Sequence, residues 1–141
     1  MAAEPRRLRV ATWNVLSNWW YVYKVFDRAT PRGAPRAWGG GPSARGRRAL
    51  TERYIASLDA DVLCLQEINP ASFIDDFAFL STGALGHYDC VLEDSRNRYM
   101  RCAVFYRRDR LRVVASSTGF KYVAVRLEPA VPPPPSANMA T

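Results

Sequence analysis

The chain has 141 residues, 48% of them hydrophobic, which is enough for one domain with a core and too little for two. Its formal net charge of +7 favours a polyanionic partner. The support is weak, because only Lys24 and Lys121 are lysines and such an arginine bias can come from the base composition of a gene. Residues 1–7 lack the apolar segment of a signal peptide, and no stretch reaches transmembrane length. We therefore expect a cytoplasmic or nuclear protein, neither secreted nor membrane-spanning.

Three cysteines, Cys64, Cys90 and Cys102, are an odd number without a C-x-x-C pair, and each falls in a predicted strand. We interpret them as small buried hydrophobic residues in a reducing compartment. This spacing and the presence of a single histidine argue against a structural zinc site.

The first predicted element is a strand over Leu8–Leu16. After it, an apolar stripe recurs at helical spacing, formed by Trp19, Val22, Tyr23 and Phe26. Three interpretations of this stripe remain open. It is a short helix that closes one end of the core, a set of aromatic platforms for nucleic-acid bases, or a contact with a membrane interface.

Residues Arg28–Arg48 are rich in Gly, Pro and Arg, which predicts a loop or a disordered insertion. Its arginines could hold a phosphate backbone, but a tolerated surface insertion is the preferred interpretation. A helix then opens at Ser43 or Gly46 and continues to Leu58, and it forms the crossover between two strands. We expect its apolar face to be Leu50, Tyr54 and Leu58.

The stretch Asp61–Glu67 is the most informative part of the sequence. Four apolar residues, Val62 to Leu65, predict a strand buried on both faces, which ends at Gln66 and Glu67. A carboxylate is thereby placed at the carboxyl end of a buried strand, the edge where ligands bind in open α/β sheets. The alternative is that Glu67 is a loop acid near the start of the next helix, where the helix dipole favours a negative charge.

The predicted strand over Leu8–Leu16 favours the first interpretation, in which Glu67 is a ligand-binding residue at the edge of the sheet. Two strands joined by a helix pair in parallel, so their carboxyl ends share one edge of the sheet. Asn14 would then lie beside Glu67. One amide oxygen and one carboxylate, completed by waters and a substrate phosphate, suit Mg2+.

After Glu67, we expect a helix with Asn69 as its N-cap and Pro70 as its first residue. Asp75 and Asp76 are adjacent, so they diverge on a helix and are interpreted as a solvated face. The apolar stripe of this helix is Phe73, Phe77 and Leu80.

Strands are predicted next over Tyr88–Leu92, Cys102–Tyr106, Leu111–Ala115 and Gly119–Leu127. Sequential strands with short turns pair antiparallel, so the sheet is mixed. His87, the single histidine, precedes the first of these strands and is given no catalytic role. A Pro-rich, disordered tail follows.

Three segments resemble successive signatures of the endonuclease/exonuclease/phosphatase superfamily, which has the DNase-I-like fold. They are Thr12–Leu16, Asp61–Glu67 with its Leu-Gln-Glu sequence, and Cys102–Arg107, in the family's order and spacing. The resemblance implies that Glu67 binds the catalytic Mg2+, or Mn2+ in its place, and that Asn14 assists at the metal or the phosphate. Glu67 and Asn14 are therefore the predicted catalytic and metal-binding residues.

The resemblance also implies an α/β fold, in which a mixed sheet with flanking helices forms the first half of a four-layer α/β/β/α sandwich. The expected organisation is a flexible N-terminus (1–7), the N-terminal half of the family's domain (8–128) and a Pro-rich tail (129–141). The family's general base, a His–Asp pair near the end of the domain, has no counterpart in this sequence. We therefore expect a truncated domain.

The strand-one asparagine is followed two residues later by Leu16, where abasic-site endonucleases of this fold carry Asp. The motifs are more similar to the branch that contains messenger-RNA deadenylases and nocturnin-like phosphatases. This similarity predicts a phosphorylated substrate, with RNA preferred over DNA.

Two other functions remain open. One is a non-catalytic metal- or nucleic-acid-binding module without a general base. The other is a phosphoinositide or sphingolipid hydrolase that uses Trp19–Phe26 as its membrane contact. Strands such as Val62–Leu65 and Cys102–Tyr106 look apolar on both faces, whereas the two helices cover one face. We therefore expect an open sheet face and a protein partner that covers it.

Overall fold

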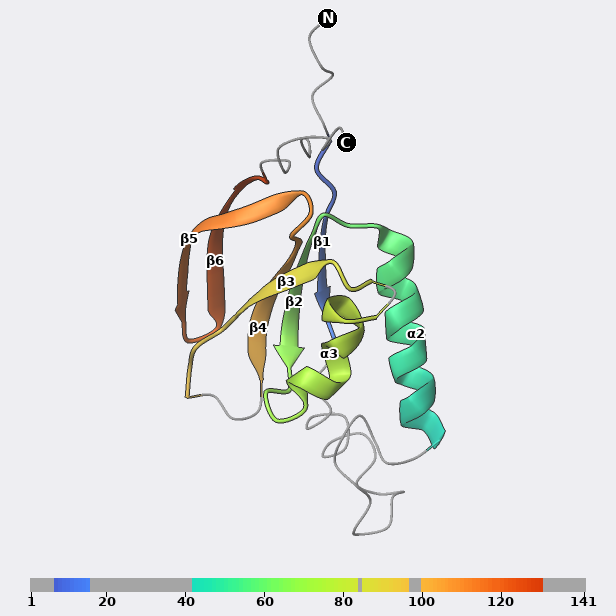
Figure 1. Ribbon diagram of the computed structural model, residues 1–141. Helices are drawn as coiled ribbons and strands as arrows, with labels where there is room; N and C mark the ends of the chain where they lie inside the picture. The colour runs from blue at the N-terminus through green and yellow to red at the C-terminus, as the bar shows by residue number, and fades with distance from the viewer. Residues whose placement is uncertain (1–6, 16–41, 84, 97–99, 131–141) are drawn as a thin grey trace, which may run out of the picture.

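The computed structural model of the protein describes residues 7–15, 42–83, 85–96 and 100–130 (Figure 1). The stripe predicted over Trp19–Phe26, most of the loop predicted over Arg28–Arg48, and the tail from residue 131 lie outside the described residues. The elements in chain order are β1 (Val10–Asn14), α2 (Pro42–Leu58), β2 (Val62–Ile68), α3 (Phe73–Ser81), β3 (Tyr88–Leu92), β4 (Arg101–Arg107), β5 (Leu111–Gly119) and β6 (Tyr122–Pro129).

The predicted mixed sheet is confirmed. Four strands lie in the order β1-β2-β4-β3, with β1 and β2 parallel and the other pairs antiparallel. The expectation that β5 continues this sheet is wrong, because β5 and β6 form a separate two-stranded sheet. Both edges of β4 are already hydrogen-bonded, to β2 and to β3, so β5 has no free edge beside β4 on which to pair.

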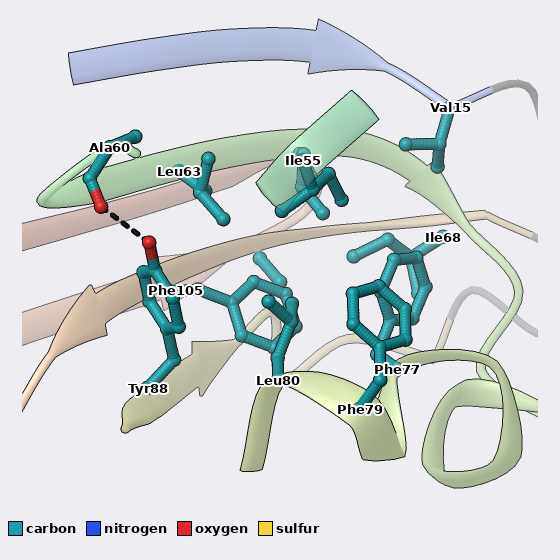
Figure 2. Close-up of a cluster of buried hydrophobic side chains, with 12 residues drawn as sticks. Val15, Ile55, Ala60, Leu63, Ile68, Phe77, Phe79, Leu80, Tyr88 and Phe105 are labelled. Carbon is teal, nitrogen blue, oxygen red and sulfur yellow. Dashed lines mark hydrogen bonds between the residues drawn. The ribbon is translucent and has the colours of Figure 1, made fainter. Parts of the chain in front are cut away.

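The hydrophobic core lies between one face of the four-stranded sheet and the two helices. Figure 2 shows Ile55 of α2, Leu63 of β2, Leu80 of α3 and Phe105 of β4 converging there, and each is at most 4% exposed. The predicted stripe of α3 is confirmed, since Phe77 and Leu80 are buried and Phe73 packs against the same cluster.

The predicted apolar face of α2 is wrong in part. Leu50 is 58% exposed and Tyr54 is 52% exposed, whereas Thr51 and Ile55 are buried. Positions 51, 55 and 58 are also spaced i, i+4, i+7, so the sequence contains two neighbouring stripes. The helix uses the one centred on Ile55, and Tyr54 instead lies edge-on to the Trp13 ring, with 5.1 Å between centroids.

The start of α3 also differs from the prediction. The helix begins at Phe73 after Ser72, because Asn69 and Pro70 form a turn in which Asn69 Oδ1 accepts the Ala71 N–H at 3.0 Å. Asp76 does not lie on a solvated face. It is 3% exposed and accepts a hydrogen bond from Ser72 Oγ at 2.6 Å.

The sheet face turned away from the helices is partly covered, so the prediction of an open face fails over β4. Val62 and Val104 alternate with core residues and therefore point to this second face, yet they are 5% and 6% exposed. The β5–β6 hairpin lies against β4 here. Over β1 the same face remains accessible, since Val10 is 60% exposed.

All three cysteines lie in strands, as predicted, but they are half-buried rather than buried. Burial raises the pKa of each thiol, that of Cys90 to about 12. At neutral pH these thiols are protonated, so they are weak nucleophiles and poor metal ligands.

Candidate functional site

The candidate site is built on an irregularity in β2. The strand does not end at Gln66 and Glu67, as predicted, but continues to Ile68 through a β-bulge, in which these two residues together face Cys102 of β4. Leu65 and Ile68 are both in the core, so two residues lie between core positions where a regular strand has one. Glu67 absorbs the extra residue with a left-handed backbone, at φ 58°.

The bulge turns the Glu67 side chain toward β1. In the parallel register Asn14 of β1 pairs with Gln66, and Asn14 Nδ2 donates a hydrogen bond to Glu67 Oε1 at 2.9 Å. The two residues that the sequence places at one sheet edge are therefore in contact across 53 positions of the chain.

The second carboxylate oxygen of Glu67 is buried, and it lacks a hydrogen-bond partner among the described residues. A buried oxygen left unpaired costs on the order of 1–3 kcal/mol, and more when it carries charge. A divalent cation would satisfy this oxygen, and an amide oxygen beside a carboxylate is a donor set that Mg2+ accepts. Asn14 and Glu67 thus fit a Mg2+ site that is completed by waters and phosphate oxygens.

Two further residues, Thr12 and Gln66, stabilise this corner, and neither was singled out from the sequence. Gln66 Nε2 donates to Thr12 Oγ1 at 3.0 Å and to the carbonyl oxygen of Cys64 at 2.9 Å. One of these bonds ties the bulge to β1, and the other ties the Gln66 side chain back to its own strand, β2. The usable signal was the alternation of strand β1, which puts Thr12 and Asn14 on one face.

The charged residues of the β4–β5 turn lie at the other end of the sheet. Arg107 and Arg110 bond to Asp109 and Asp61, and the Arg107 N–H donates to the carbonyl of Asp61, which precedes β2. These arginines are ion-paired far from Glu67, so they give the site no general attraction for phosphate.

His87 belongs to that same distant end. Its carbonyl oxygen accepts the Arg108 N–H at 2.9 Å, and its ring lies 4.8 Å from that of Tyr88, centroid to centroid. Within the described residues, no three metal-ligating side chains gather in one place. Neither helix of this part of the chain is long and apolar enough to cross a bilayer.

The family comparison identifies the fold that this site occupies. The profile of the Endonuclease/Exonuclease/phosphatase family matches residues 11–139, which is most of the chain. No curated protein sequence matches significantly.

Three solved structures illustrate the likeness in fold. The human Nocturnin catalytic domain with bound sulfate is 21% identical over 86% of this chain, with a TM-score of 0.57. ANGEL2, a 2',3'-cyclic phosphatase, is 20% identical over 86%, with a TM-score of 0.59. The Bacteroides thetaiotaomicron mannosyl-6-phosphatase Bt3783 is 23% identical over 79%, with a TM-score of 0.50.

These likenesses establish the fold, and the predicted partial α/β sandwich is confirmed. The chain spans 44% of the Nocturnin domain, 37% of ANGEL2 and 35% of Bt3783, which is less than half of each.

Proposed function

The chain belongs to the endonuclease/exonuclease/phosphatase family, and on this premise we propose that it forms the metal- and phosphate-binding half of a Mg2+-dependent phosphodiesterase or phosphatase acting on RNA. The observation that carries the proposal is the paired Asn14 and Glu67, with one Glu67 oxygen buried and unpaired. The matched family joins nucleases and phosphatases, whose common substrate group is a phosphate ester.

Each residue has a definite task in this proposal. Asn14 donates to Glu67 Oε1 and so fixes the carboxylate plane, which leaves Oε2 for Mg2+, or for Mn2+ in its place. Asn14 would also assist at metal-bound water or at the phosphate when these are bound. When bound, the metal neutralises charge on a phosphate oxygen and favours attack on phosphorus.

RNA is the preferred substrate because the motifs of the chain are closest to the deadenylase and nocturnin-like branch. Two of the solved structures with this fold fit that choice, since one is Nocturnin and the other is a 2',3'-cyclic phosphatase.

A second candidate function is a metal- or nucleic-acid-binding module without catalysis. Its supporting observation is the position of His87, which the Arg108 N–H holds at the opposite end of the sheet from Glu67. A hydrolase also needs a group that activates water, and the described residues do not bring a histidine to the site. The domain limits proposed above, 8–128 with a tail from 129, apply to both functions.

The test compares Glu67→Gln with Glu52→Gln, a matched change on α2. Mn2+ binding is measured by water proton relaxation, and hydrolysis is measured with an end-labelled oligoadenylate. We expect Glu67→Gln to abolish Mn2+ binding and Glu52→Gln to leave it unchanged. Equal Mn2+ affinity in the two variants would refute the site. Metal binding without hydrolysis by the native chain would support the non-catalytic module.

A further inference from the structure

The tip of the β5–β6 hairpin presents aromatic rings and a cation to water. Phe120 is 68% exposed and Tyr122 is 49% exposed. Lys121 lies between them in sequence, and its ammonium is 5.1 Å from the centroid of the Phe120 ring. Large rings left in water lose the stabilisation that burial provides, so this arrangement calls for a binding partner.

The tip lies next to the candidate metal site. Cys102 faces the Gln66–Glu67 bulge across the strand pair, and its Sγ is 3.8 Å from the carbonyl oxygen of Lys121. Adjacent strands are about 4.8 Å apart, so the hairpin tip is one strand away from Glu67. Figure 1 shows the tip at the same end of the molecule as the arrowhead of β2.

A buried carboxylate holds the tip in place. Glu93, 1% exposed, accepts the Lys121 N–H at 3.0 Å with one oxygen and the Cys102 N–H at 2.8 Å with the other. Lys121 adopts a left-handed backbone, at φ 65°. One side chain thus fastens the exposed turn to the strand that faces the bulge.

The ring of Tyr122 is also fixed from below. A Cβ atom at Gly119 would lie 2.4 Å from Cε1 of Tyr122, so the ring lies directly against a position that only glycine can occupy. The Tyr122 hydroxyl is 3.4 Å from Ser117 Oγ. The tip is therefore ordered before any partner arrives, which lowers the entropic cost of binding.

We propose that Phe120, Lys121 and Tyr122 bind the nucleotide that flanks the phosphate held at Glu67, in single-stranded RNA. The rings offer stacking faces for a base, and Lys121 offers a charge for the neighbouring phosphate. The proposal rests on the proposed function, because it takes the Glu67 site as the place where the substrate phosphate binds. The observation that supports it is an exposed aromatic and cationic hairpin tip, which is held against the strand next to that site.

The test measures binding without turnover. A fluorescent, short single-stranded oligoadenylate with phosphorothioate linkages, which resist hydrolysis, is titrated with the full chain in the presence of Mn2+, and anisotropy gives the Kd. The variants are Phe120→Ala, Phe120→Leu, and Lys121→Asn, which removes the charge with a residue that tolerates a left-handed backbone. Ile74→Ala is the control, since Ile74 is an apolar residue on α3 and is 80% exposed. Circular dichroism melts verify that each variant folds.

We expect Phe120→Ala and Phe120→Leu to weaken binding by about fivefold or more, because both lose the stacking face. Lys121→Asn should weaken binding and reduce the slope of log K against log salt by about 0.7, the value for one phosphate contact on a single strand. Ile74→Ala should bind like the native chain.

Three results would overturn the proposal. The first is unchanged affinity in all folded tip variants, and the second is a native chain that does not bind the oligonucleotide. The third is binding to anionic phosphatidylserine vesicles that Phe120→Ala abolishes while RNA affinity stays the same, which would assign the tip to a lipid surface. None of these affects Mn2+ binding at Glu67, so failure here is separable from failure of the proposed function.

Discussion

Arg110 and Asp61 form an ion pair in which Arg110 Nη1 lies 2.6 Å from Asp61 Oδ1. The other oxygen of Asp61 accepts the backbone N–H of Arg9 at 2.9 Å. Asp61 is 3% exposed, so one carboxylate joins the segment before β1, the start of β2 and the turn after β4. This is the end of the sheet opposite Glu67, and its role is to align the strands that form the site.

Asp61→Asn should lower the free energy of unfolding by about 2 kcal/mol, because a buried, charge-assisted hydrogen bond to Arg110 is lost. Urea denaturation measures the change. Asp109→Asn is the control. Asp109 forms an ion pair with Arg107, but its side chain is 47% exposed. Its substitution should therefore lower the free energy of unfolding by less than about 1 kcal/mol. Equal losses in the two variants would contradict the structural role of Asp61.

Acid should destabilise the fold through Glu93. Burial alone would raise the pKa of Glu93, but hydrogen bonds from Ser95, the Lys121 N–H and the Cys102 N–H outweigh it and lower the pKa. A lowered pKa means that the folded state binds the proton less tightly than the unfolded chain. The stabilisation is therefore complete above about pH 4.5 and is lost as the pH falls through the lower, folded pKa.

Urea midpoints between pH 7 and pH 3 test this expectation. Glu93→Gln should be less stable than the native chain at pH 7, and the difference should shrink toward pH 3. Asp61 also has a lowered pKa, since the Arg9 N–H and Arg110 outweigh its burial, so some pH dependence remains in the variant. A native and a variant curve that stay parallel would show that the Glu93 carboxylate does not stabilise the fold through these hydrogen bonds.

The left-handed backbone of Glu67 predicts an inverted order of stability. In a strand, glycine normally destabilises relative to alanine by about 0.5–1 kcal/mol. At φ 58° a Cβ atom costs about 1–2 kcal/mol, so Glu67→Gly should be at least as stable as Glu67→Ala. Gln66, without a positive φ, should show the normal order. Thermal unfolding compares the stability of the Gly and Ala variants at Glu67 with that of the Gly and Ala variants at Gln66. The same order of stability at both positions would contradict the bulge geometry.

Ile55 and Leu50 test which face of α2 packs on the sheet. Ile55 is 1% exposed, so Ile55→Ala should cost about 2–4 kcal/mol of unfolding free energy. Leu50 is 58% exposed, and Leu50→Ala should cost less than about 0.5 kcal/mol. Chemical denaturation compares them. A larger loss at Leu50 would restore the apolar face expected from the sequence.

The sequence was sufficient for the existence and order of the strands and for the meeting of Asn14 with Glu67. The predicted bounds of the last two strands were wrong, since β5 continues past Ala115 to Gly119 and β6 begins at Tyr122. Uninterrupted apolar runs such as Val62–Leu65 identify buried strands, and parallel pairing brings their carboxyl ends together. It was not sufficient for α2, where Leu50 and Ile55 belong to overlapping helical stripes and tertiary packing chooses between them. Asp76 was assigned to a solvated face because two adjacent acidic residues on a helix give no sign of which one is turned inward, toward Ser72.

The bulge itself had no local signal. Gln66 and Glu67 are ordinary strand-end residues, and the extra residue becomes evident only against β4, where the two face Cys102. The placement of β5 in a separate sheet could not be predicted for the same reason, because it depends on β4 being paired on both sides.

Because of the bulge, the site depends on the number of residues in β2 as well as on their identity. Two residues separate Leu65 from Ile68, and both ends must reach the core. Loss of one codon between them would restore a regular strand, keep the core intact and leave one side chain where two now hold Thr12 and Asn14. A deletion of one residue here would therefore remove the hydrogen bond to Thr12 or the one to Asn14 without disturbing the core.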